Sequence, residues 1–147
     1  LRPGISLYGG GPEGRPDDRL RPVAAFRADV IQIRDVPEGE TVGYARGFTA
    51  EHPTTLAIVS VGYADGVLRS NYPNGKVWVG ETLRPIIGRV SMDLIAVDVT
   101  GLKVSPGDTV ELFGPHRMID DAAADAGTIA YELITSVSAR VPRVYVG

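Results

Sequence analysis

Apolar and polar residues alternate over short stretches along most of the chain, which is typical of half-buried β-strands. Residues 23–36 alternate imperfectly and end at a turn, Pro37-Glu38-Gly39-Glu40. Residues 54–62 form a strongly apolar run rich in β-branched side chains, which predicts a buried strand. The same reasoning predicts further strands over residues 41–45, 84–90, 93–99, 109–113 and 140–146.

Helical spacing is confined to residues 120–135. Asp120 and Asp121 are predicted to cap a short helix that Gly127 stops, and Thr128 a second helix with apolar positions Ala130, Leu133, Ile134 and Val137. Asn74-Gly75, before Val77-Trp78-Val79, is a hairpin signal. The pattern therefore predicts a mainly β domain of seven to nine strands, a Greek-key barrel or sandwich, with a short helical insertion.

The beginning of the chain differs from the rest. Residues 9–18 contain a glycine run followed by charged residues and are expected to form an open, polar linker. We therefore expect a boundary near residues 9–20, with residues 1–10 belonging to a different structural unit from residues 11–147. The first residue, Leu1, is not methionine, which we interpret as the start of a fragment or of a processed product.

Composition excludes several classes of site and partner. The 147 residues suffice for one domain that buries about two-thirds of its unfolded surface. A formal charge of -3 argues against a broad electrostatic grip on nucleic acid. No apolar run reaches the roughly 20 residues that span a bilayer, and no signal peptide opens the chain. With no cysteine and only two histidines, thiolate sites and a histidine-rich metal centre are excluded, and we expect no bound metal.

Five motifs carry a family resemblance, although Gly62-Tyr63-Ala64-Asp65-Gly66 taken alone is more typical of a turn at the end of a strand. The motifs are Arg2-Pro3-Gly4-Ile5-Ser6-Leu7-Tyr8-Gly9, Val42-Gly43-Tyr44, Val61-Gly62-Tyr63-Ala64-Asp65-Gly66, Gly88-Arg89-Val90-Ser91-Met92-Asp93, and Tyr131-Glu132 with Arg140-Val141-Pro142-Arg143. In this order and spacing they resemble the C-terminal part of alanine racemase, a pyridoxal-phosphate enzyme, over essentially the whole chain.

The resemblance implies a cytoplasmic isomerase that interconverts L- and D-alanine and supplies D-alanine for peptidoglycan. It implies a (β/α)8 barrel before residue 1, which holds the lysine that binds pyridoxal phosphate. Lys76 and Lys103 do not match that position, so the chain alone is expected to be inactive. Residues 1–10 then correspond to the end of the barrel, and the whole protein is expected to be a homodimer that binds neither nucleic acid nor membrane.

The resemblance also assigns roles to single residues. Tyr44 matches the tyrosine base, which needs positive neighbours because a tyrosine pKa is ordinarily about 10. Arg2 matches the arginine that faces the pyridine nitrogen, and an always-charged guanidinium there discourages protonation of the ring. Gly4 and Ile5 match the backbone N–H groups that hold the cofactor phosphate. On the residues alone, Tyr44 is a strand-edge side chain, Arg2 a terminal charge, and Gly4 part of a turn.

A second group belongs to the substrate side. Met92 matches the residue whose backbone N–H receives the substrate carboxylate, with Asp93 fixing the loop or its neighbours. Tyr63, Arg69 and Arg89 match residues that line the narrow access path to the site, although Arg69 is equally typical of a solvated surface. We interpret Asp65 as shaping the turn after Tyr63. In a head-to-tail dimer, Tyr44 and this second group serve the partner's cofactor.

One position departs from the family pattern. Many members have a tyrosine just before the arginine of the closing motif, in contact with the phosphate, whereas this chain has Ala139. The phosphate hydrogen bond is then lost or supplied by another residue. Ala139 favours a second hypothesis, an amino-acid racemase of broader specificity. Related decarboxylases are disfavoured because their site cysteine is missing, and a non-catalytic β-barrel interaction module is the remaining alternative.

Overall fold

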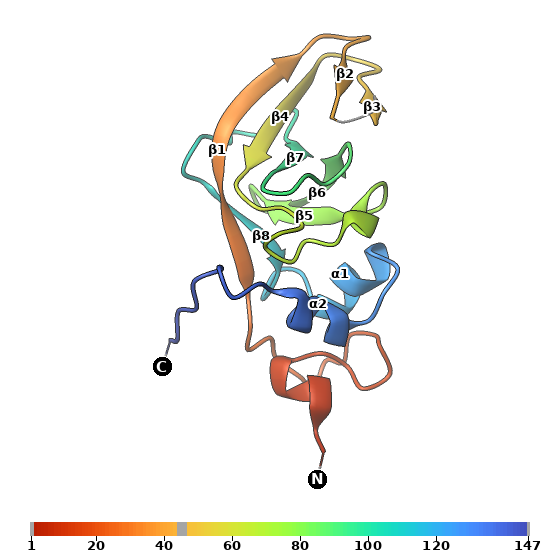
Figure 1. The fold of residues 1–147 in the computed structure, drawn as a ribbon, viewed down its shortest axis with the longest axis vertical. Helices are drawn as coiled ribbons and strands as arrows, with labels where there is room; N and C mark the ends of the chain where they lie inside the picture. Colours follow the sequence, from red (N-terminus) through yellow and green to blue (C-terminus); the bar gives the residue numbers. More distant parts are fainter. Residues whose placement is uncertain (1, 44–46, 147) are drawn as a thin grey trace.

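The computed structural model describes residues 2–43 and 47–146. Its centre is a closed antiparallel barrel (Figure 1) in the order β1 (Phe26–Val36), β4 (Thr54–Val59), β7 (Ile95–Asp98), β6 (Thr82–Ile87), β5 (Lys76–Val79) and β8 (Thr109–Phe113). A separate two-stranded sheet pairs β2 (Thr41–Val42) with β3 (Phe48–Thr49). The helices are α1 (Ile119–Asp125), α2 (Ala130–Ser136) and the 3-10 turns η1 (Gly4–Tyr8) and η3 (Arg69–Asn71). The predicted mainly β barrel is confirmed, and the sandwich is excluded.

The long first strand closes the barrel. The beginning of β1 pairs with β8, as at Ala28 and Val110, and its end pairs with β4, as at Ile33 and Ala57. A register shift between Val30 and Gln32 bends the strand. The alternation of inward and outward side chains changes at this point, and Ile31 faces solvent. The order β4-β7-β6-β5 has the Greek-key form, since β5, β6 and β7 follow one another while β4 returns beside β7.

Valine and isoleucine side chains fill the barrel. Val30, Val59 and Val97 are among its fully buried residues. A smaller apolar cluster holds Val36, Ala50 and Leu56, with Val42 and Phe48 of the β2–β3 pair packed against it. The β2–β3 pair therefore has its own apolar support at one end of the long axis, while η1, α1 and α2 lie at the other end (Figure 1).

The N-terminal segment packs against the β domain. Ile5 is buried in the main core cluster, and Gly9, Gly10 and Gly11 are buried as well, so the expectation of an open linker is wrong for these glycines. The Gly11 N–H donates to Asp120 Oδ2 at 2.8 Å, and a Cβ on Gly10 would lie 2.6 Å from the Ile5 side chain. Glycine is needed here because the segment runs directly over α1. The domain boundary itself stays a prediction.

The helix caps differ from those predicted. The N-cap residues are Met118 and Ile129, and neither makes a side-chain capping hydrogen bond. Asp120 lies inside the first turn, where its buried carboxylate holds the N-terminal segment instead. Thr128 donates its hydroxyl hydrogen bond to the Glu132 side chain. Tertiary contacts thus override the local capping preference, whereas Gly127, with φ of 69°, ends α1 as predicted.

Two predicted β features are wrong, and four strands differ from their predicted bounds. The hairpin turn is Gly80-Glu81, where both residues have positive φ; residues 69–71 before Asn74-Gly75 form η3 rather than a strand. Residues 140–146 form no strand because each barrel strand is already paired on both edges, and Tyr145 is 92% exposed. The strand β1 begins only at Phe26, and β4 ends at Val59. The strand β6 covers Thr82–Ile87 instead of residues 84–90, and β7 covers Ile95–Asp98 instead of residues 93–99. The predicted strand 41–45 is confirmed for Thr41–Val42, while residues 44 and 45 lie outside the described residues.

Candidate functional site

Two turns at one side of the barrel form a single unit. The Tyr63 N–H donates to the Ser91 carbonyl at 2.9 Å, and the Ala64 N–H donates to the Met92 carbonyl at 3.0 Å. A Cβ on Gly62 would lie 2.3 Å from the Met92 carbonyl oxygen. Only glycine permits so close an approach, so the Gly62 motif and the Met92 motif, separated in sequence, are held against each other.

The turn at residues 91–94 is closed by a serine. The Ser91 N–H donates to the Leu94 carbonyl at 3.1 Å, and the Leu94 N–H donates to Ser91 Oγ at 3.1 Å. Met92 and Asp93 form the tip, and Met92 is 52% exposed. Within residues 2–43 and 47–146, no group accepts a hydrogen bond from the Met92 N–H. The turn is thus a tight strand connection at whose tip the backbone N–H groups of Met92 and Asp93 donate to no described residue.

Asp65 shapes the neighbouring turn. Its Oδ2 accepts from the Gly62 N–H at 2.8 Å, which closes the turn that carries Tyr63. Its Oδ1 accepts from Arg140 Nε at 2.7 Å. The Arg140 hydrogen bond holds the pKa of the Asp65 carboxyl below its usual range, so the group is ionised at neutral pH. The interpretation of Asp65 as a structural residue is confirmed.

Arg140 joins the two turns from a third segment of chain. Its Nη2 donates to Asp93 Oδ1 at 2.7 Å while Nε holds Asp65. Two carboxylates raise the Arg140 pKa above its ordinary value, with the Asp65 hydrogen bond the larger cause. The guanidinium therefore keeps its charge and bridges the turn that carries Tyr63 and the tip that carries Met92.

Of the three residues expected along the access path, Tyr63 and Arg69 lie against each other, and Arg89 lies next to the end of β2. The Arg69 guanidinium carbon lies 5.9 Å from the centre of the Tyr63 ring, a cation–π distance. Arg69 belongs to η3, so this short turn places the charge on the ring. Arg89 is exposed and follows Gly88, whose Cβ would lie 3.2 Å from the Val42 carbonyl oxygen. Arg89 is thus adjacent to the strand that leads to Tyr44.

Tyr44 itself lies outside the described residues, so its role as the base stays a prediction. Its described flanks can be placed. The Gly43 Cβ position lies 3.5 Å from the Arg89 backbone nitrogen, and the Tyr72 hydroxyl donates to the Gly47 carbonyl. The two described flanks thus lie against the Gly88-Arg89 turn and against Tyr72, respectively.

The residues expected to hold the cofactor phosphate form a second group. Gly4 has φ of 57°, and a Cβ there would lie 2.3 Å from the Tyr131 hydroxyl oxygen. That hydroxyl accepts from the Ile5 N–H at 3.1 Å. Gly4 thus lies against a hydroxyl that is paired with a backbone donor, and both groups suit a phosphate oxygen. Arg2 is exposed and lies two residues before Gly4.

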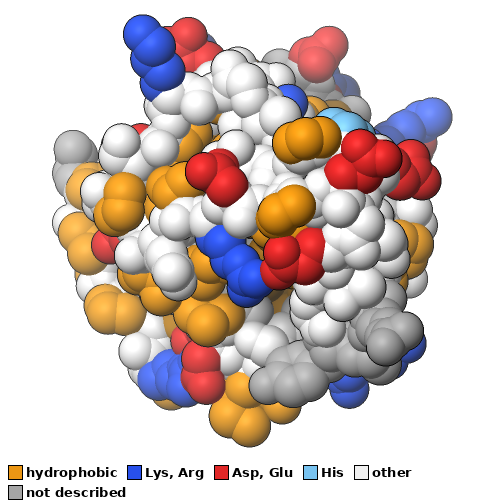
Figure 2. Space-filling model, turned by 90° about the horizontal axis from the view of Figure 1, so that it is seen from above, with side chains coloured by type: hydrophobic (Ala, Val, Ile, Leu, Met, Phe, Trp, Pro, Cys, Tyr) orange, Lys and Arg blue, Asp and Glu red, His pale blue; other side chains and the backbone are white. Residues whose placement is uncertain are grey.

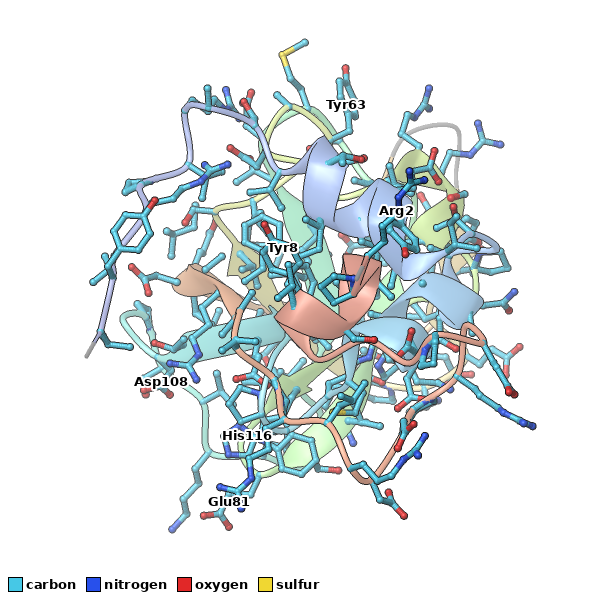
Figure 3. The ribbon with its side chains drawn as sticks, turned by 90° about the horizontal axis from the view of Figure 1, so that it is seen from below. Arg2, Tyr8, Tyr63, Glu81, Asp108 and His116 are labelled. Carbon is cyan, nitrogen blue, oxygen red and sulfur yellow. The ribbon has the colours of Figure 1, made fainter. Side chains whose placement is uncertain are left out.

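The two groups of residues are not in polar contact with each other within the described chain. Across residues 2–43 and 47–146, no hydrogen bond or ion pair links Arg2, Gly4 or Ile5 to Tyr63, Arg89 or Met92. Arg2 and Tyr63 lie on the same side of the view from below, opposite His116 and Glu81 (Figure 3). The flanks of Tyr44, in β2 and β3, lie at the far end of the long axis from η1 (Figure 1).

The end that carries β2 and β3 mixes charge types. Figure 2 shows acidic and basic side chains interspersed with several groups of hydrophobic side chains over this face. No group of three or more candidate metal ligands occurs in the part of the chain that the structure describes. In the same part, no helix has the length and apolar character needed to cross a membrane.

Sequence reasoning missed the roles of two residues, although it quoted both inside motifs. Tyr131 lies 126 positions from Ile5, and Arg140 lies 75 positions from Asp65. The signal available in the sequence was that separate motifs carry complementary groups. For one pair these are a tyrosine hydroxyl and a backbone N–H, and for the other a guanidinium and a carboxylate. Ala139 is exposed, and the tyrosine at the Ile5 amide is Tyr131.

Comparison with known proteins identifies relatives over nearly the whole chain. Residues 23–145 match the family model described as alanine racemase, C-terminal domain. An alanine racemase of Cereibacter sphaeroides is 48% identical over 144 residues, covering 98% of this chain and 40% of the relative. A catabolic alanine racemase of Agrobacterium fabrum is 45% identical over 149 residues, covering 99% of this chain and 38% of the relative.

Solved structures agree with the sequence relatives. The biosynthetic alanine racemase of Pseudomonas aeruginosa superposes with a TM-score of 0.91 at 41% identity, covering 98% of this chain and 41% of that one. The alanine racemase of Bartonella henselae with covalently bound pyridoxal phosphate has a TM-score of 0.89 at 41% identity, covering 97% and 40%. The chain thus spans about 40% of the length of its relatives. By sequence and by fold, this chain belongs to the alanine racemase C-terminal domain family.

Proposed function

We propose that this chain is the C-terminal domain of a pyridoxal-phosphate-dependent alanine racemase that interconverts L- and D-alanine in the cytoplasm, with D-alanine used for peptidoglycan. The observation that supports it most directly is the Ser91–Leu94 turn, which presents the available Met92 N–H beside Tyr63. A backbone donor of this kind suits a small carboxylate. Similarity to alanine racemases over 98% of the chain supports the same assignment.

The proposed chemistry divides between two bases on opposite faces of the substrate α-carbon. Pyridoxal phosphate, when bound, supplies the electron sink that makes this carbon acidic. Tyr44 removes or returns the proton on one face, while a lysine outside this chain serves the other. The Met92 N–H orients the substrate by its carboxylate, and Tyr63 with Arg69 and Arg89 restricts the size and charge of molecules that reach the site.

The cofactor-holding residues proposed for this chain are Arg2, Gly4, Ile5 and Tyr131. The backbone N–H groups of Gly4 and Ile5 would bind phosphate oxygens, with the Tyr131 hydroxyl, which now accepts from the Ile5 N–H, beside them. Arg2 faces the ring nitrogen and keeps it unprotonated. Alanine is the proposed substrate, and the broader specificity that Ala139 favours is the alternative that the substrate comparison below tests.

The proposed assembly is a homodimer in which each site takes parts from both chains. The flanks of Tyr44 and the Gly4–Tyr8 turn lie at opposite ends of the molecule, which supports this division (Figure 1). The N-terminal barrel domain is the other proposed partner. No described hydrogen bond links the side chain of Lys76, at the start of β5, or that of Lys103 to Gly4 or Ile5. The isolated chain is therefore expected to be inactive.

The test uses the full-length protein with bound pyridoxal phosphate. L-alanine is incubated with it, and loss of optical rotation is followed until the two enantiomers are equal. Serine and larger amino acids are measured in parallel. Racemisation of alanine with kcat/KM at least tenfold above serine is expected, since a small pocket difference discriminates by about 10–200-fold. Absence of alanine racemisation, or equal use of larger substrates, would contradict the proposal.

A further inference from the structure

Arg140 lies where three segments of the chain meet. Its Nε and Nη2 atoms donate to separate carboxylates, Asp65 in the turn that carries Tyr63 and Asp93 at the tip beside Met92, both at 2.7 Å. Its own segment is tied to the same turn, because the Ser138 N–H donates to the Asp65 carbonyl at 3.0 Å. Among the described side chains, no other forms a hydrogen bond or ion pair with the Asp93 carboxylate.

The backbone contacts restrain only one side of the Met92 tip. The Ser91 and Met92 carbonyls are held by the Tyr63 and Ala64 N–H groups, and Ser91 Oγ closes the turn at its base. The Met92 N–H donates to no described residue, and the Asp93 side chain beside it is 58% exposed. A two-pronged guanidinium is rigid and planar, so it fixes the direction of a carboxylate better than a single point charge does.

We propose that Arg140 is a positioning residue: by holding Asp93 against the Asp65 turn, it sets the direction in which the Met92 N–H meets the substrate carboxylate. This inference rests on the proposed function. The electrostatics agree with the geometry, because the Arg140 hydrogen bond lowers the pKa of Asp65 and both aspartates raise that of Arg140. Arg140 thereby also offsets negative charge beside an incoming carboxylate.

The chain contains a matched control three residues later. Arg143 donates to the Ser138 carbonyl at 2.6 Å and to the Val137 carbonyl at 2.9 Å, after the end of α2, and it contacts neither aspartate. Arg140→Met and Arg143→Met therefore remove the same charge and side chain from the same segment. Only the first releases the Met92 tip.

The experiment measures steady-state kinetics of the full-length holoenzyme with L-alanine for the wild type, Arg140→Met, Arg140→Lys and Arg143→Met. For Arg140→Met, KM is expected to rise about tenfold, the cost of one misplaced charge-assisted contact, with kcat changed less than about threefold. Inhibition by acetate, a carboxylate probe without an amino group, should weaken by the same factor. Arg140→Lys should recover only part of the loss in substrate and acetate binding. Arg143→Met should leave KM, kcat and the acetate inhibition constant unchanged.

A second readout does not depend on activity. Hydrogen–deuterium exchange at residues 92–94 should be faster in Arg140→Met than in the wild type, and unchanged in Arg143→Met. If Arg140→Met does not fold, Asp93→Asn keeps the Arg140–Asp65 pair and should still raise KM and the acetate inhibition constant. Unchanged KM, acetate inhibition and exchange in these variants would overturn the role of Arg140, as would equal effects of Arg143→Met. A wild type that does not racemise alanine would instead contradict the proposed function.

Discussion

The hydroxyl of Tyr131 accepts a hydrogen bond from the Ile5 backbone N–H at 3.1 Å, across 126 positions of sequence. It joins α2 to the N-terminal turn, and it lies beside the Gly4 position where a Cβ would be only 2.3 Å from the hydroxyl oxygen. The contact therefore brings together a tyrosine hydroxyl and a backbone donor at the place proposed for the cofactor phosphate.

Tyr131→Phe should weaken cofactor retention in the full-length protein. One hydrogen bond to a charged acceptor contributes about 1.5–3 kcal/mol, so dissociation of pyridoxal phosphate should increase at least tenfold. Retention is measured by absorbance after dialysis. Tyr145→Phe, at a tyrosine that is 92% exposed, is the control and should retain the cofactor. If Ala139→Tyr but not Tyr131→Phe alters retention, the phosphate contact belongs to position 139.

Gly4→Ala tests the close approach of the Tyr131 hydroxyl to Gly4. Gly4 has φ of 57°, and Gly14, with φ of 72° and nothing within 4 Å of its Cβ position, has the same backbone restriction without the contact. Both substitutions should cost about 1 kcal/mol for a left-handed backbone. Gly4→Ala should lower the melting temperature further and weaken cofactor binding. Equal effects of the two substitutions would show that the Tyr131 contact is unimportant.

Tyr44→Phe removes one of the two proposed bases and keeps the ring. Loss of a general base typically lowers the rate by roughly two to four powers of ten. The decrease should affect proton removal from one enantiomer only. Exchange of the α-hydrogen with deuterium is measured separately from L- and D-alanine. We expect exchange to fail from one enantiomer and to continue from the other. Small, equal losses from both would exclude Tyr44 as the base.

Mixing two inactive variants tests whether each site contains parts of two chains. Arg2→Ala and Tyr44→Phe place their defects in different halves of the proposed site. Random reassociation of the two variants into dimers should restore about a quarter of the wild-type sites, because half of the dimers are mixed and each has one intact site. Activity is assayed after mild dissociation and remixing. No recovery beyond the sum of the separate variants would indicate that each site lies within one chain.

Asp65 should contribute to stability only where it is ionised. Its folded pKa lies below the usual value, chiefly through the Arg140 hydrogen bond, so its contribution is present above the unfolded pKa of about 3.9 and is lost as pH falls through the folded pKa. Asp65→Asn should therefore lower the melting temperature at pH 7, and its difference from the wild type should shrink below about pH 4. Melting temperatures are measured from pH 7 to pH 3. A difference that does not change with pH would show that ionisation of Asp65 is irrelevant.

Local pattern was sufficient for most strands and for the family. The strand at residues 109–113 has the bounds that alternation predicted, and Gly127 ends its helix as a lone glycine should. These features depend on side-chain period and backbone freedom, which are properties of short segments. The ordered motifs likewise identified the family, because residue type and spacing can be read without a fold.

Tertiary structure decided the features that depend on partners distant in the sequence. Residues 140–146 have a strand-like pattern, but a closed barrel offers them no unpaired edge. Asp120 looks like a helix cap, yet its carboxylate is buried at 2% exposure against the Gly11 N–H. Tyr131 and Arg140 gain their partners only when α2 and the closing motif fold back over the N-terminal turn and the Asp65 turn. A hydrogen bond across the fold depends on where the backbone carries both groups, and no local pattern records that position.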